Sequence, residues 1–120
     1  MNNLKVLVVE DDEDDQFLLS EVFEVHPNVS LFFKDSCLKA LNAIGTEHYD
    51  FVLVDFRLGV IDSHPVVRRL LELNIPFSIL SGSLEEEVKF ELEDIFERIK
   101  FWTKREMLSV PKKVMGLIEG

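Results

Sequence analysis

The stretch Val6-Leu7-Val8-Val9-Glu10-Asp11 decides the fold, because it joins an apolar run directly to two acids. A short, fully apolar, valine-rich run is typical of a strand that is buried on both faces of a parallel sheet. The abrupt change of polarity marks the carboxyl end of that strand. In open α/β sheets, ligands bind beyond the carboxyl ends of the strands, so Glu10 and Asp11 stand where function is expected.

The same alternation continues along the chain. Further strands are predicted over 29–33, 51–54 and 77–80, with a short fifth strand near 99–102. Apolar residues at helical spacing predict five helices: one ending near 26, one over 37–45, one around 66–71, a long one over 84–99, and a last one over 107–118. Five rounds of strand and helix argue for a parallel sheet covered by helices on both faces.

Length and composition restrict the class of protein. The chain has 120 residues, 47% of them hydrophobic, which suits one globular domain with its own core. A single cysteine excludes a disulfide framework and a cysteine-based zinc site, and it fits a cytoplasmic protein. The formal net charge of −10 repels phosphate backbones, so no direct binding of nucleic acid is expected. The apolar runs, of about four residues at most, give no segment that could span a membrane.

Residues that could carry chemistry follow four of the strands. Glu10 and Asp11 follow the first strand, Asp55 the third, Ser81 the fourth and Lys104 the fifth. Carboxylates gathered at one edge repel each other, and a hard cation such as Mg²⁺ relieves that repulsion through oxygen ligands. With the metal present, Asp55 can act as a nucleophile toward a phosphoryl group, because carboxylates form acyl phosphates. Lys104 would neutralise charge on that group, and Ser81 would donate a hydrogen bond to it.

Four segments together resemble the receiver domain of two-component response regulators. They are VLVVED at 6–11, YDFVLVD at 49–55, ILSG at 79–82 and FWTK at 101–104, in the order and at the spacing of that domain. The resemblance covers essentially the whole chain. It implies a flavodoxin-like (CheY-like), doubly wound, five-stranded parallel sheet of order 2-1-3-4-5 with helices on both faces. It also implies a single receiver domain over 1–120, with no output domain present.

The resemblance assigns the metal site and the nucleophile. Asp55 matches the phosphoacceptor of receiver domains. Glu10 and Asp11 match the acidic pair that holds Mg²⁺, and Asp55 is itself a metal ligand. Arg57 matches the position whose backbone carbonyl is a further ligand.

It assigns the switching residues and the partners as well. Ser81 and Lys104 match the residues that contact the phosphoryl group, and Ser81 and Phe101 match the pair that changes conformation with it. The donor in this family is a phosphohistidine on a sensor histidine kinase or on a histidine phosphotransfer protein. The resemblance therefore implies phosphorelay signalling, in which the last helix-strand-helix unit binds a downstream partner. Such a domain assists its own phosphorylation and dephosphorylation but is not a turnover enzyme.

The chain departs from the receiver pattern at several positions. Gly59 stands where a proline is common, so a less rigid loop is expected. Arg105 follows Lys104 in place of a proline, and a trans 104–105 bond is expected because a non-proline cis bond costs about 2.5–4 kcal/mol. The usual Gly-Ala before the fifth strand is replaced by Phe96-Glu97-Arg98-Ile99. These departures motivate an alternative, an atypical receiver that binds a protein partner without phosphorylation.

Other interpretations stay open beside this one. One alternative is a phosphohydrolase that uses Asp55, but such an enzyme would need an acid two residues later, where Arg57 stands. The long cationic side chain of Arg57 could instead reach the phosphoryl group or a partner. Phe101 could equally be a core residue. The acidic run continues from Asp12 to Asp15, and these residues are interpreted as charges at a helix start, with Asp12 and Asp15 resembling a capping box.

Overall fold

The central sheet is built around β1 (Leu4–Val9). β2 (Val29–Lys34) pairs with one edge of β1 and β3 (Phe51–Val54) with the other, both in parallel. β6 (Phe77–Ser81) then pairs with β3, and β7 (Phe101–Thr103) pairs with β6. The order β2-β1-β3-β6-β7 is the expected 2-1-3-4-5 when the strands of this sheet are counted by themselves. The structure, a computed structural model, describes residues 3–59 and 61–119.

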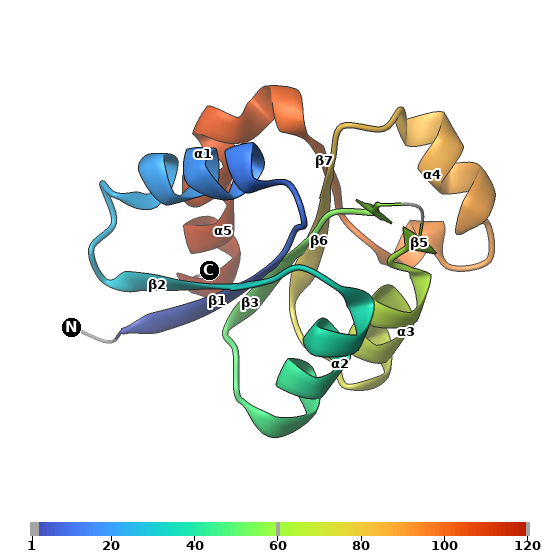
Figure 1. Ribbon diagram of the computed structural model, residues 1–120, viewed down its shortest axis with the longest axis horizontal. Helices are drawn as coiled ribbons and strands as arrows, with labels where there is room; N and C mark the ends of the chain where they lie inside the picture. Colours follow the sequence, from blue (N-terminus) through green and yellow to red (C-terminus); the bar gives the residue numbers. More distant parts are fainter. Residues whose placement is uncertain (1–2, 60, 120) are drawn as a thin grey trace.

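Helices cover both faces of the sheet (Figure 1). α1 (Glu13–Phe23) and α5 (Val110–Glu119) lie on one face, and α2 (Cys37–Thr46), α3 (His64–Glu72) and α4 (Glu85–Glu91) lie on the other. Within the described part of the chain, none of the helices has both the length and the apolar character needed to cross a bilayer.

The side chains of β1 explain why both faces need covering. Successive residues of a strand point to opposite faces. Val6 and Val8 pack in the cluster that contains the buried residues of α1 and α5, whereas Leu7 and Val9 pack with those of α2, α3 and α4. All four are buried. The apolar run that predicted a strand buried on both sides is therefore confirmed.

The prediction of a long helix over 84–99 is wrong. α4 ends at Glu91, and turns and a short 3-10 helix, η1 (Phe96–Arg98), follow it. The backbone N–H of Ile95 donates to the carbonyl of Leu92, and that of Arg98 to the carbonyl of Ile95, so bonds of the tighter i to i−3 type appear here. Leu92 and Ile95 are nevertheless buried. The apolar spacing predicted a helix because Leu92 and Ile95 are buried in the core, although the backbone forms turns there.

Further differences lie near the ends of β3 and β7. A small antiparallel hairpin of β4 (Arg57–Leu58) and β5 (Ile61–Asp62) was not predicted; Gly59, beside it, has a φ of 68°. The last helix begins later than predicted, because the 3-10 segment η2 (Lys104–Ser109) precedes α5. No cis peptide bond occurs among the described residues, so the 104–105 bond is trans as expected.

The buried turn after α4 makes a stability prediction. Replacing Leu92, which is fully buried, by alanine should lower the free energy of unfolding by about 2–5 kcal/mol through lost burial and the cavity left behind. Leu84, at the other end of α4, is 59% exposed, and its replacement by alanine should cost less than about 1 kcal/mol. Urea denaturation of both variants checks this. Equal losses would mean that Leu92 is not part of the core.

Candidate functional site

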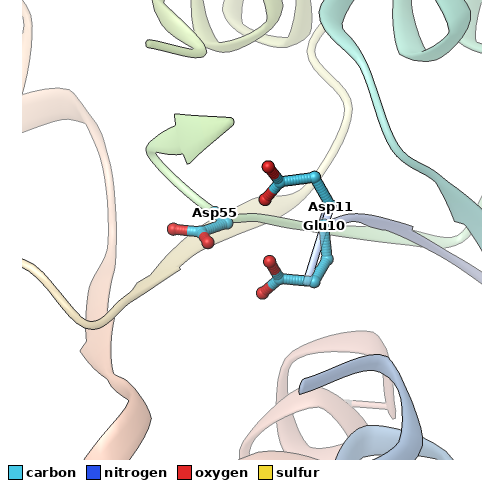
Figure 2. Close-up of side chains that lie close together, drawn as sticks. All are labelled: Glu10, Asp11 and Asp55. Carbon is cyan, nitrogen blue, oxygen red and sulfur yellow. The ribbon is translucent and has the colours of Figure 1, made fainter. Parts of the chain in front are cut away.

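The carboxyl ends of β1 and β3 lie side by side. Val9 is the partner of Val54 in the ladder, and the backbone N–H of Asp55 donates to the carbonyl of Val9 at 2.9 Å. Glu10 and Asp55 therefore leave the sheet next to each other. The carboxylates of Glu10, Asp11 and Asp55 gather at this edge, as Figure 2 shows, and one oxygen from each lies within 4.8 Å of the other two.

Two of these three carboxylates are buried. Glu10 is 2% exposed and Asp55 is 8% exposed, while Asp11 faces solvent. Burial raises the pKa of Glu10 to about 8, and the hydrogen bond from Lys104 lowers it in part while the charge of Asp55 raises it further. The charged form of the Glu10 carboxyl is therefore disfavoured, because water cannot stabilise it well at this buried position. A cation bound at this edge would remove that penalty.

Lys104 supplies one cation. It is the first residue of η2, directly after β7, and its Nζ lies 2.8 Å from Glu10 Oε1 and 3.0 Å from Asp55 Oδ2. The same Nζ also pairs with Asp15 of α1. Burial by itself would lower the pKa of Lys104, but the hydrogen bonds to Asp15 and Glu10 and the nearby charge of Asp55 raise it above its usual value. The ammonium group therefore stays charged at neutral pH.

The donor set fits a hard divalent cation. Carboxylate oxygens are preferred ligands of Mg²⁺ and Mn²⁺, and Mg²⁺ commonly uses one or two carboxylates together with water. The ammonium between Glu10 and Asp55 shows that these oxygens already accommodate a positive charge. Asp11 is the exposed member of the cluster.

Ser81 lies beside this cluster. It ends β6, is fully buried, and its Oγ accepts a hydrogen bond from the N–H of Ser83 at 3.0 Å. It is the partner of Thr103 in the ladder, so it stands next to the residue that precedes Lys104. A cavity of about 130 Å³ is lined by Ser81, Thr103 and Lys104 among others. Ser81 and Lys104 thus line one cavity, and Lys104 is the member of that lining that contacts the carboxylates of Glu10 and Asp55.

The side chains of Arg57 and Phe101 lie away from the carboxylates, which leaves the predicted role of the Arg57 backbone carbonyl untested. The guanidinium of Arg57 forms an ion pair with Glu91 of α4, with Nη2 2.6 Å from Oε1. The backbone N–H of Arg57, by contrast, donates to Asp55 Oδ1, with 3.4 Å between nitrogen and oxygen. Phe101 is half-buried in the cluster on the α2–α4 face, with its ring 6.2 Å from that of Phe96. Neither side chain lies among the carboxylates.

The contact between Asp15 and Lys104 was not predicted from the sequence. Asp12 is the N-cap of α1, as its interpretation as a helix-start residue implied, and its Oδ1 accepts hydrogen bonds from the N–H groups of Asp14 and Asp15. Asp15, however, does more than favour the helix dipole, because its carboxylate pairs with Lys104. Its position in the sequence could have indicated this contact, because Asp15 lies in the first turn of α1, three residues after the N-cap and close to the end of β1. The partnership of Arg57 with Glu91 had no comparable signal.

Comparison with known proteins bears on the fold. No protein-family model matches the sequence, and no curated protein matches it. Among solved structures, the Francisella response regulator 1452 receiver domain has 26% identity and a TM-score of 0.77, with 98% of each chain covered. The phosphorylated cyanobacterial phytochrome response regulator RcpA has 22% identity and a TM-score of 0.75, covering 98% of this chain and 92% of that one.

A third neighbour adds an observation about metal. The Mn²⁺-bound form of response regulator Rcp1 has 21% identity and a TM-score of 0.73, and the match covers 95% of this chain and 91% of that one. These similarities extend over nearly the whole chain and agree with the strand order described above. The expected fold is confirmed: the chain has the receiver-domain fold of response regulators.

Proposed function

We propose that this chain is a receiver that accepts a phosphoryl group on Asp55 and changes its affinity for a partner in response. The observation that carries the proposal is the position of Asp55. Its carboxylate stands at the end of β3, within 4.8 Å of two further carboxylates and 3.0 Å from the ammonium of Lys104. A nucleophilic carboxylate with a fixed cation and a set of metal ligands beside it is equipped for phosphoryl transfer.

The proposed transfer starts from a phosphohistidine on a sensor histidine kinase or a histidine phosphotransfer protein. An oxygen of Asp55 attacks phosphorus and forms the new P–O bond. The P–N bond of the phosphohistidine breaks, and the imidazole nitrogen keeps the electron pair and takes up a proton. The product is an acyl phosphate on Asp55.

The other residues of the site orient and neutralise the transferred group. Lys104 pairs with one phosphoryl oxygen, and the Ser81 hydroxyl donates a hydrogen bond to another. Glu10, Asp11 and Asp55, with the backbone carbonyl of Arg57, would hold Mg²⁺. When bound there, Mg²⁺ supplies divalent positive charge that offsets the charge on the phosphoryl oxygens.

The response is proposed to reach the surface made by α4, β7 and α5. Ser81 ends β6 beside β7, and Phe101 lies in β7, so a change at Ser81 has a short path to Phe101 through the paired strands. This surface would bind the downstream protein.

The net charge of −10 disfavours nucleic acid as a direct partner, and the single cysteine suits a cytoplasmic setting. Residues 1–120 would act as one receiver unit rather than as a turnover enzyme.

Phosphorylation is tested by mass spectrometry of the intact chain. Incubation with a small phosphodonor and Mg²⁺ should add one phosphoryl group to the wild type and none to Asp55→Asn, which lacks the nucleophile. Asp14→Asn is the matched control, because Asp14 is exposed and lies on the same edge of the fold. Chelating the metal should abolish the gain. A folded wild type that binds Mg²⁺ without gaining mass would instead favour a partner-binding module that works without phosphate.

The metal site is tested by thermal unfolding. An ion that binds the native state alone stabilises it, by about 2.7 kcal/mol at a concentration 100 times its Kd. Mg²⁺ should therefore raise the Tm of the wild type by several degrees, and Asp11→Asn should lose most of the rise because it removes one of the clustered ligands. Asp14→Asn should keep it. Equal rises in all three proteins would show general screening of the acidic surface rather than a defined site.

A further inference from the structure

Three carboxylates contact one ammonium, that of Lys104, at the edge of the sheet. The Nζ of Lys104 lies 2.8 Å from Glu10 and 3.0 Å from Asp55, and it pairs with Asp15 as well. An ammonium has three donors, so these partners can use all of them. The side chain of Lys104 is only 19% exposed. Its place therefore depends on which of the three carboxylates are free to receive it.

Two of these three partners, Glu10 and Asp55, are also candidate metal ligands. Glu10 and Asp55 belong, with Asp11, to the cluster of described residues able to hold a metal ion, whereas Asp15 does not. A divalent cation on Glu10 and Asp55 would take the oxygens that now face Lys104 and would repel its ammonium. Among the described residues that contact the Lys104 ammonium, Asp15 is the partner that such an ion leaves available.

We propose that Asp15 is a positioning residue, which holds Lys104 at the rim of the site while a metal ion occupies Glu10 and Asp55. The inference rests on the proposed function and deepens it. Asp15 would keep the ammonium within reach of a phosphoryl group on Asp55 without leaving it between the metal ligands. It acts through Lys104 and does not touch the transferred group.

The fold holds Asp15 in place for this task. Its backbone N–H donates to Asp12 Oδ1 at 3.0 Å, so the N-cap fixes the first turn of α1. Its side chain is 22% exposed, close to the value for Lys104. Asp14, its neighbour, is exposed. One residue of the acidic run is therefore turned inward to Lys104, and the adjacent one offers a control of equal charge.

The test measures Mg²⁺ affinity of the full chain by isothermal titration calorimetry. Asp15→Asn should weaken Mg²⁺ binding by about fivefold or more, because Lys104 then has only the metal ligands to bind. Asp14→Asn removes the same charge and should weaken it by less than about twofold. Asp15→Glu should recover most of the affinity. Unfolding of each variant without metal verifies that the fold is retained.

A double-mutant cycle separates positioning from simple charge. In a Lys104→Met background, the loss caused by Asp15→Asn should shrink to that caused by Asp14→Asn, since no ammonium remains to be held. A loss that is equal for Asp15→Asn and Asp14→Asn, or one that is undiminished without Lys104, would overturn the positioning role and leave the proposed function intact. Failure of the wild type to bind Mg²⁺ would overturn both.

Discussion

The pairing of β1 with β3 is the constraint on which the site depends. Val9 stands opposite Val54, and the hydrogen bond from Asp55 to Val9 continues that register by one residue beyond the strands. Because side chains alternate along a strand, a slip of one residue would send each buried side chain to the opposite face and part Glu10 from Asp55. The two apolar clusters that hold β1 in register thus also set the spacing between the acids.

The site carries more negative charge than the fold alone would favour. Glu10, Asp15 and Asp55 contact the ammonium of Lys104, and an oxygen of Asp11 lies within 4.8 Å of oxygens of Glu10 and Asp55. Glu10 and Asp55 are almost fully buried. Burial disfavours the charged form of Glu10, whose pKa is raised to about 8, and this opposes folding with that acid charged. The fully covered sheet tolerates this penalty. A buried acid with a raised pKa, next to other carboxylates at the edge of an otherwise consistent fold, is typical of functional sites.

The sequence pattern predicted what depends on local order along the chain. Apolar runs predicted the five strands. Glu10 and Asp55, which directly follow two of the predicted strands, and Lys104, which lies near the end of the fifth, are brought together by the structure. What the sequence pattern could not predict depends on contacts between distant elements. α4 ends where turns begin that bury Leu92 in the core. Asp15 pairs with Lys104 of η2, and Arg57 pairs with Glu91 of α4. The proposed roles of Ser81 and Phe101 are motions, which a pattern of residue types does not describe.

Gly59 gives its loop a backbone conformation that a proline cannot adopt. Many receivers place a proline at this position, and proline fixes φ near −65°. Here φ is 68°, on the other side of the map, beside the β4–β5 hairpin. A side chain at this position would also put its Cβ 3.7 Å from Asp11 Oδ2. A proline introduced at this position would therefore conflict with the φ that the loop adopts beside the hairpin.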